Sequence, residues 1–567
     1  MTPPAPVTGW RAAFPPAQWL ASYQAEWLVR DAVAGVTLAA YAIPVALAYA
    51  TLAGLPPQYG IYCYLAGGLL YALFGSSRQL AVGPTSAISL LVGTTIAGMA
   101  AGDPQRWADI AALTALVVAA MSILAWGLRL SSLVDFISET ILLGFKAGAA
   151  LTIALTQLPK LFGVNGGGED FFERIATLAG QLPDTNPAVL GFGLAALALL
   201  LIGERLAPGR PVALAVVALS IAVLSTTSLT GLGFSSVGEL PQGLPDFQAP
   251  ELRLRDVDGV LPLAFACLLL AYVEGVSAAR TLAQKHGAAI DPRQELLALG
   301  AANLGAALSH GYPVAGGLSQ SSVNDKAGAK TPLALAFASL TIALCLMFLT
   351  GLLRNLPNVV LAAIVLVAVK GLIDVAALRQ LWRVSRLEFG ISMTTLAGVL
   401  LLGILKGVML AAVVSLLLLI RSAARPHVAF LGRIPGFHGL SDMQRNPENA
   451  SVPGSLAFRV DAALVYFNVE HVREVVWDRI RSSTAPLRLV VFDLSTSPHV
   501  DLAGARMLAR LHADLKAAGI ELRLAGAHAT VRDMLRADGM EERAGYLGHR
   551  IAAIEILDEF EGVGSRQ

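Results

Sequence analysis

Long stretches without a charged residue constrain this chain more than any other feature of its sequence. No Asp, Glu, Lys or Arg occurs between Asp31 and Arg78, nor over residues 79–102 or 331–353. A helix needs about 20 mainly apolar residues to cross the hydrocarbon core of a bilayer, and these stretches are long enough. Only 14% of the residues are charged, whereas soluble proteins average about 25%. The sequence therefore predicts an integral membrane protein.

The charge-free stretches, counted with the shorter apolar runs, predict about fourteen membrane spans. When the spans are numbered from Asp31 with the N-terminus inside, most Lys and Arg residues fall on the inner side, as the positive-inside rule requires. We therefore expect N- and C-termini in the cytoplasm and a location in a bacterial-type cytoplasmic (inner) membrane, with lipid around the spans. Residues 1–30 lack the apolar core of a signal peptide. They are expected to form a cytoplasmic N-terminal segment.

Composition and motifs exclude several other classes of protein. The 41 basic and 40 acidic residues nearly cancel, and without a basic block we expect no nucleic-acid partner. The three cysteines lie in apolar runs, which argues against a disulfide scaffold. We find no phosphate-binding loop, nucleophile elbow or metal-ligand spacing. We therefore expect no enzyme activity and no bound cofactor.

The composition changes after Arg425, and this change predicts the domain boundaries. Residues 31–425 are expected to form the membrane domain. Residues 426–455, rich in Pro, Gly and Asn, are interpreted as a linker. Residues 456–567 alternate between short apolar runs and amphipathic segments, which predicts a cytoplasmic α/β domain. The expected elements are strands Leu456–Val460, Ala463–Phe467, Leu487–Phe492 and Glu521–Ala525, and helices Asn468–Arg481 and Leu502–Ala518.

Two of the apolar stretches are interrupted by proline, glycine and hydroxyl residues, at 82–86 and at 312–321. Such interruptions at matched positions of two halves point to a transporter site built from half-helices. The positive N-terminal ends of the half-helices would face an anion. The alternative is that both are packing contacts or hinges. The candidate anion-binding residues in these segments are Thr85, Ser86, Gly317, Ser319 and Gln320.

Glu274 follows an apolar run that we expect inside the membrane. A carboxylate at membrane depth is costly, so it predicts a functional role, here coupling transport to a proton or another cation. The alternative places Glu274 at the cytoplasmic interface, where it would pair with Arg280 or Lys285. Spacing alone does not separate the two.

Several motifs resemble the SulP family of anion transporters. They include Ile43-Pro44, Ala53-Gly54-Leu55-Pro56-Pro57, Val82-Gly83-Pro84, Asp291-Pro292 and Ala302-Asn303, and the resemblance covers about residues 25–425. The stretches Val490–Ser495 and Val500–Ala505 resemble a STAS domain, which this family carries. The resemblance implies a polytopic α-helical protein with 14 spans in a seven-plus-seven inverted repeat. It also implies UraA-like core and gate subdomains, a homodimer and elevator-type motion.

The chain departs from the family pattern at the expected site. Many members have an arginine where Gln320 stands, and exchanging or conducting animal members often have phenylalanine where Thr85 stands. Without that arginine, the negative charge of Glu274 beside an anion would be unbalanced. A proton on Glu274, or a sodium ion held by Glu274 and Thr85, would restore the balance. The resemblance also places Tyr49 near the anion, although core packing is its alternative role.

These observations predict secondary active transport of an inorganic anion, most simply sulfate, by proton- or sodium-coupled symport. Sodium-coupled bicarbonate symport and proton-coupled dicarboxylate symport are alternatives, and an anion exchanger or channel is a second alternative. A nucleobase transporter of the same fold is a third hypothesis. The STAS-like domain lacks a hydroxyl residue directly after Asp501, which argues against a phosphorylation switch. We therefore expect the STAS-like domain to act in dimerisation or in binding a cytoplasmic partner.

Overall fold

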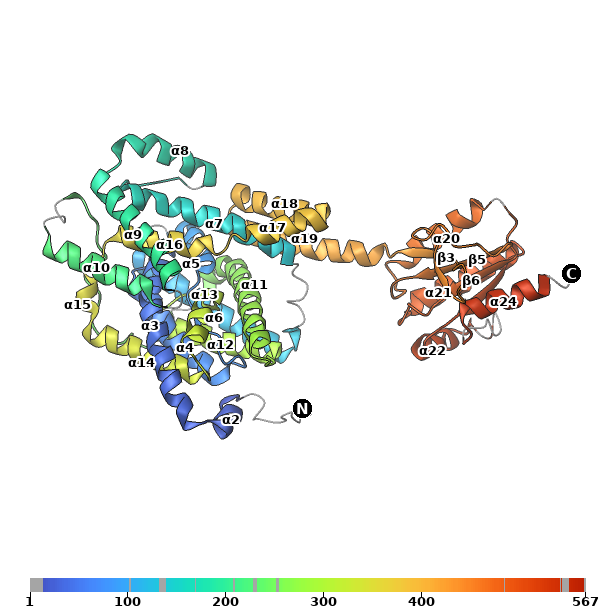
Figure 1. Cartoon of the computed structure of the whole chain (residues 1–567), viewed down its shortest axis with the longest axis horizontal. Coiled ribbons are helices and arrows are strands. Elements are labelled where there is room, and N and C mark those ends of the chain that lie inside the picture. Colours follow the sequence, from blue (N-terminus) through green and yellow to red (C-terminus); the bar gives the residue numbers. More distant parts are fainter. Residues whose placement is uncertain are drawn as a thin grey trace. The chain divides into compact units, whose positions relative to one another are not determined.

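The computed structural model describes residues 14–564 except for 101–102, 132–138, 169, 208–209, 228–231, 251–253, 484, 541 and 543–549. The chain forms two compact units, Met1–Ser415 and Leu416–Gln567, shown in Figure 1. The boundary lies within the last long apolar helix, ten residues before the expected end of the membrane domain at residue 425. Each unit has its own hydrophobic core.

The first unit is helical. Its core runs through the middle of the bundle, and apolar side chains remain exposed around the outside, as they must in a protein surrounded by lipid. Its main helices are α3 (Ala25–Leu52), α4 (Gln58–Phe74), α5 (Ser86–Ala100), α6 (Pro104–Gly127), α7 (Glu139–Phe162), α8 (Phe171–Gln181), α9 (Pro187–Leu206), α10 (Val212–Thr226), α11 (Leu254–Lys285), α12 (Pro292–Leu308), α13 (Leu318–Lys326), α14 (Leu333–Phe348), α16 (Asn358–Lys370), α17 (Val375–Val384), α18 (Arg386–Leu402) and α19 (Ile404–Ala424).

Among the described residues, six helical segments are long and apolar enough to cross a membrane, and four shorter apolar helices accompany them. Two of the shorter ones, α5 and α14, have 15 and 16 residues. These helices agree with the prediction of a multi-pass membrane protein. The number of spans, fourteen, stays a prediction.

The two interrupted stretches meet in the middle of the helical unit. Strand β1 (Val82–Gly83) pairs antiparallel with β2 (Ala315–Gly316), although about 230 residues separate them. Half-helix α5 begins directly after the first strand and α13 directly after the second. The prediction of two half-helices is confirmed, and the strand pair brings their N-terminal ends together.

Two buried carboxylates form hydrogen bonds that connect parts of this unit distant in sequence. Asp31 on α3 accepts hydrogen bonds from the Lys330 amide at 2.7 Å and the Thr331 hydroxyl at 2.6 Å. Glu295 on α12 accepts from the Tyr71 hydroxyl at 2.8 Å and the Ser76 hydroxyl at 2.6 Å. Their hydrogen bonds give them structural roles, because a buried charge is tolerated only when it is paired or hydrogen-bonded.

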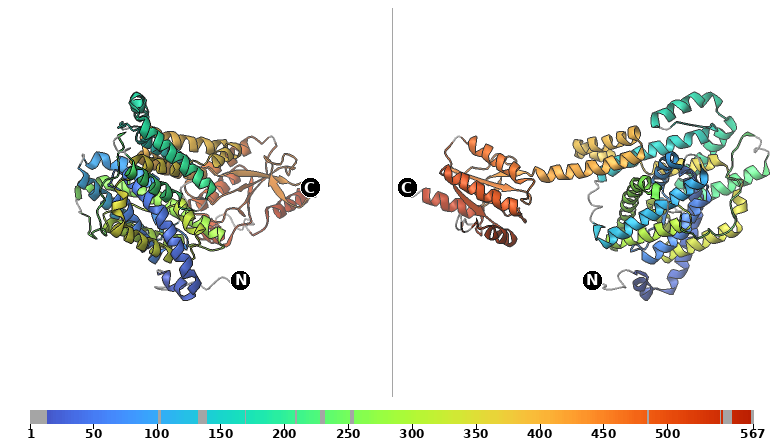
Figure 2. Two further views of the ribbon diagram at one scale, coloured as in Figure 1. Left: turned by 60° about the vertical axis from the view of Figure 1, so that its left-hand side comes forward. Right: turned by 180° about the vertical axis from the view of Figure 1, so that it is seen from behind.

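The second unit is an α/β domain around one five-stranded sheet, with helices on both faces (Figure 2). The strand order is β4-β3-β5-β6-β7, and β5, β6 and β7 run parallel. The rings of Phe458 and Phe492 stack at 4.2 Å in its core. Its elements are β3 (Val428–Arg433), β4 (Leu440–Asp442), β5 (Ser455–Val460), α20 (Val469–Arg481), β6 (Leu489–Asp493), α21 (Leu502–Ala517), β7 (Glu521–Ala525), α22 (Ala529–Ala537) and α24 (Ala553–Gly564).

Two expectations for this unit were wrong. Residues 426–455 are not only a linker, because β3 and β4 lie there and β3 pairs with β5 in the sheet. Residues 463–467 do not form a strand, apart from a single bridge of Leu464 to Val500. Side chains hold this segment in a turn instead: the Asp501 carboxylate accepts from the Tyr466 amide at 2.8 Å and also caps α21.

An ion-pair cluster connects β3 to α24 on the surface of the second unit. Arg433 forms ion pairs with Asp558 and with Glu561, and His438 lies 3.0 Å from Asp558. Hydrogen bonds from His438 and Arg433 lower the pKa of Asp558. The ionised carboxylate therefore stabilises the contact between β3 and the C-terminal helix α24.

Candidate functional site

A cavity of about 170 Å³ lies where the two half-helices begin. It is lined by all seven residues predicted for the site, which come from four parts of the chain that are distant in sequence. They are Tyr49 on α3, Thr85 and Ser86 at the start of α5, Glu274 on α11, and Gly317, Ser319 and Gln320 at the start of α13. The structure thus brings the predicted residues together, while what they bind stays a prediction.

The backbone at the cavity suits an anion. The first amide groups of a helix have no partner within the helix and carry a partial positive charge. Helices α5 and α13 both begin at this cavity. Gly83, just before α5, is required for the close approach of β1, because a Cβ atom there would lie 2.2 Å from the Tyr64 ring. Two partial positive charges are therefore directed at one small volume.

Glu274 lies inside helix α11 and lines the cavity. It has no hydrogen-bond or ion-pair partner at bonding distance among the described residues, unlike Asp31 and Glu295. The alternative pairing with Lys285 is wrong, because Lys285 pairs with Asp325 at 2.5 Å. Glu274 is therefore a half-buried carboxylate at the cavity wall that is available to a proton or a cation.

Lys146 on α7 lines the same cavity and was missed by the sequence analysis. Gly144 and Gly148 face α18, where a Cβ atom would lie 2.0 Å from the Ser392 carbonyl oxygen and 2.9 Å from Val399, respectively. Because successive residues turn by about 100° around a helix, Lys146 between the two glycines points to the opposite side. Its ammonium interacts electrostatically with Glu274. The inference that Glu274 has no positive counterpart was therefore wrong.

Thr85 contributes a buried hydroxyl that has no hydrogen-bond partner at bonding distance among the described residues. It lies close enough to Glu274 to interact with the carboxylate. Buried polar groups are nearly always hydrogen-bonded, so this hydroxyl is available to an ion bound beside Glu274. Tyr49 and Ser86 lie next to each other on the same wall, and both are buried.

Gln320 does not aim its amide at the cavity. Its Nε2 donates to the carbonyl oxygens of Ala81 at 3.0 Å and Ala315 at 3.3 Å, and its Oε1 accepts from the Tyr64 hydroxyl. The expected amide hydrogen bond to an anion is therefore replaced by hydrogen bonds that hold β1, β2 and α4 together. Ser319 remains exposed at the cavity and is free to contact a bound ion.

A second cavity of about 480 Å³ adjoins the first and shares Tyr41, Val45 and Ser319 with it. It is also lined by Arg210, Lys326, Lys370 and Glu204. Three basic residues against one carboxylate make this approach electropositive. An electropositive cavity therefore adjoins the candidate site.

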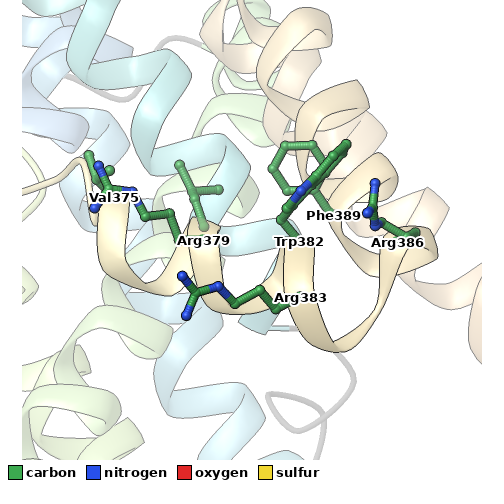
Figure 3. A pocket seen from close by; sticks show the side chains of 7 residues that line it. Val375, Arg379, Trp382, Arg383, Arg386 and Phe389 are labelled. Atoms are coloured by element: carbon green, nitrogen blue, oxygen red, sulfur yellow. The ribbon is translucent and has the colours of Figure 1, made fainter.

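Another hollow, of about 690 Å³, lies elsewhere, on the surface of α17 and α18 (Figure 3). Helix α17 has no buried residue. Arg386 stacks over the Trp382 ring, with its guanidinium carbon 3.7 Å from the ring centroid. This hollow has no half-helix end and no carboxylate among its lining residues. The smaller cavity is therefore the candidate site.

Comparison with known proteins agrees with this geometry. The model of the sulfate permease family matches residues 28–395, and the model of the STAS domain matches residues 446–545. This chain belongs to the sulfate permease family. It is therefore a multi-pass membrane transporter with a C-terminal STAS domain, and not an enzyme.

Relatives support the family assignment, and solved structures share the fold. A probable sulfate transporter of Mycobacterium tuberculosis is 34% identical over 92% of this chain and 93% of its own length. The chloroplastic sulfate transporter 4.1 of Arabidopsis thaliana is 31% identical over 94% of this chain and 80% of its own. The murine Slc26a9 anion transporter, solved in the inward-facing state, superposes with a TM-score of 0.87 at 23% identity, covering 98% of this chain and 96% of that one. The transmembrane domain of the cyanobacterial bicarbonate transporter BicA matches with a TM-score of 0.61 at 22% identity, covering 69% and 98%.

Proposed function

We propose that this sulfate permease family member is a secondary active transporter of a small inorganic anion, in the first place sulfate. The anion would bind between the N-terminal ends of α5 and α13, near Lys146, with Glu274 as the group that couples its movement to a cation. The relatives named as sulfate transporters support the substrate. The observation that carries the proposal is the cavity in which two half-helix ends, a lysine and an unpaired carboxylate meet.

Counting the charges around the cavity explains the need for a coupled cation. Each half-helix end contributes about half a positive charge, and Lys146 as an ammonium adds one, which gives about +2. An ionised Glu274 reduces the total to about +1. A divalent anion such as sulfate would then leave an excess of about one negative charge, whereas a monovalent anion would be balanced. One proton or one sodium ion at Glu274 neutralises the site with sulfate bound.

The absence of an arginine at the position of Gln320 does not by itself require a coupled cation. Lys146 supplies a positive charge that the sequence analysis did not consider, and the remaining imbalance depends on the charge of the substrate. Sodium would be a co-transported substrate and would use oxygen ligands, for which Glu274 and the unpaired Thr85 hydroxyl are candidates. A proton would need Glu274 alone.

The size of the cavity supports a small ion. About 170 Å³ is well below the volume of typical pockets for drug-sized ligands, which begin at about 300 Å³. Sulfate and bicarbonate both suit this volume better than a larger dicarboxylate. Sodium-coupled bicarbonate symport therefore stays the main alternative, supported by the fold shared with the bicarbonate transporter domain. An anion exchanger or a channel would need no cation and stays the second alternative.

The proposal also covers the movement, oligomeric state and membrane orientation of the transporter. We expect elevator-type movement of the half-helices relative to the helices that carry Lys146. We also expect a homodimer in a bacterial inner membrane, with both termini in the cytoplasm and a cytoplasmic partner for the STAS domain. The basic second cavity would then open toward the cytoplasm.

Uptake into liposomes tests the proposal. Labelled sulfate, bicarbonate and succinate are supplied to the reconstituted protein with imposed proton or sodium gradients, and Glu274→Gln is measured beside the wild type. We expect saturable sulfate uptake that either a proton or a sodium gradient accelerates. If neither gradient changes the rate of sulfate uptake, transport is not coupled to a proton or a sodium ion. If no anion is taken up, the proposed function is refuted.

A further inference from the structure

A third cavity of about 600 Å³ lies in the helical unit, separate from the two described above. Its walls come from the end of α3, the middle of α5, the start of α6, the last turns of α7 and helix α8. Lys160 and Arg174 line it, and no carboxylate lies among its described lining residues. A cavity of this size that carries only positive side-chain charge is suited to a hydrated anion.

The third cavity lies further along the helices that line the candidate site. Three helices line both: α3 through Tyr49 and then Leu52, α5 through Ser86 and then Gly93, and α7 through Lys146 and then Gln157. At 1.5 Å per residue the steps correspond to about 5 Å, 10 Å and 16 Å along the helices. The second, basic cavity takes the opposite direction, because on α3 it shares Tyr41 and Val45 with the candidate site but does not reach Tyr49. The three cavities therefore follow one another along α3, with the candidate site in the middle.

The two cations are placed differently from ordinary surface charges. Lys160 is partly buried in the last turn of α7 and makes no hydrogen bond or ion pair with a described residue. Arg174 is held by its Nε, which donates to the Gly168 carbonyl oxygen at 3.0 Å. Gly168 has a φ of 91°, a conformation that favours glycine, and so the loop can present this carbonyl. Asp170 and Glu173 are close to Arg174 in sequence and affect it electrostatically, but neither lines the cavity.

We propose that this cavity is a recruitment site for the transported anion on the side opposite the basic second cavity, with Lys160 and Arg174 as its recognition residues. An anion would wait here in the present conformation, in which residues of α3 and α5 separate it from the candidate site. It would enter that site when the helices move. The inference rests on the proposed function, because it assigns one more step to the same anion. In the expected orientation, the cavity faces outward.

Transport kinetics measured from each side test the inference. With sulfate supplied outside, Lys160→Gln and Arg174→Gln should raise KM by about tenfold at low ionic strength, with kcat little changed. With sulfate supplied from the cytoplasmic side, in inside-out vesicles, KM should stay the same. Lys160→Arg keeps the charge and should keep the external KM, and Lys406→Gln, a lysine that does not line the cavity, is the matched control.

A labelling experiment tests the site without relying on transport. A Cβ atom added to Gly98 meets nothing within 4 Å, and Gly98 lines the cavity. The three native cysteines are buried, so Gly98→Cys should be the reactive thiol. A sulfonate-bearing thiol reagent added outside should label it about tenfold faster than an ammonium-bearing one, and Lys160→Gln should reduce this preference. Sulfate should slow the labelling.

The outcomes separate the inference from the proposed function. Equal labelling by both reagents, or no effect of sulfate, would overturn the recruitment site even when transport is normal. A rise in KM of the same size from both sides would overturn it as well, because it would indicate a general effect on the protein. A wild type that transports no anion, but whose Gly98→Cys variant shows the anionic preference and protection, would refute the proposed function and leave an anion site.

Discussion

Replacing Lys146 tests the charge balance of the candidate site most severely. In Lys146→Gln the site loses one positive charge, while the cavity keeps its polar wall. A sphere of about 170 Å³ has a radius of about 3.4 Å, so a centred anion lies about 5 Å from the lining charges. At that distance and an effective dielectric constant near 20, one unit of charge interacts with another by about 3 kcal/mol. Since about 1.4 kcal/mol is a factor of ten and divalent sulfate carries two unit charges, KM for sulfate should rise by at least about a hundredfold.

The double variant Lys146→Gln/Glu274→Gln gives the decisive comparison. It removes one positive and one negative charge, so the net charge of the site returns to that of the wild type. We expect it to recover at least about tenfold of the lost affinity. The assay is initial sulfate uptake into liposomes over a range of concentrations, with the amount of folded protein matched by size-exclusion chromatography. Losses that simply add in the double variant would refute the charge count.

Three further predictions concern other parts of the account. Thr85→Val should abolish sodium stimulation of sulfate uptake if sodium is the coupled ion, and Thr85→Ser should keep it; uptake against sodium concentration is the measurement. Glu295→Gln should lower the yield of folded protein and its thermal stability, by about 1–3 kcal/mol, without changing the coupling, because this carboxylate accepts hydrogen bonds in the scaffold. Asp558→Asn should lower the melting temperature of the STAS domain slightly at pH 7 but not at a pH below the folded pKa, because the lowered pKa adds stability above about 3.9, the unfolded value, that is lost as the pH falls through the folded pKa. Equal effects at both pH values would argue against that ion pair.

The sequence predicted the half-helices because proline and glycine interrupt a helix wherever they fall within an apolar stretch. It did not predict the pairing of Val82 with Gly316, because nothing local connects residues so distant in the chain. The orientation of the Gln320 side chain could not be predicted for the same reason. Its position at the start of a half-helix was foreseeable, but the direction of its amide depends on the carbonyl groups of the neighbouring strand and on Tyr64.

Lys146 was missed although the sequence contains its signal. It lies in the first half of the apolar helix α7, well before Lys160 in the last turn, and an ionisable residue inside a membrane span is a functional candidate by default. In the sequence it stands directly before the apolar run Ala147–Pro159, where a lysine at the membrane surface would also stand, so its place at the site was not predicted. Strand β3 was missed for a related reason: its residues Val428–Arg433 are mostly apolar, but the glycine, proline and asparagine residues that follow favoured a linker.

The central claim is that Glu274 couples a cation to the movement of a divalent anion. The most direct measurement is the ratio of initial sulfate uptake with and without an inward proton or sodium gradient, in the wild type and in Glu274→Gln. Glu204→Gln, which alters the neighbouring cavity and not the candidate site, is the control. The account predicts a ratio well above one for the wild type and Glu204→Gln and a ratio near one for Glu274→Gln, which still transports sulfate. A Glu274→Gln variant that keeps the full gradient stimulation would contradict it.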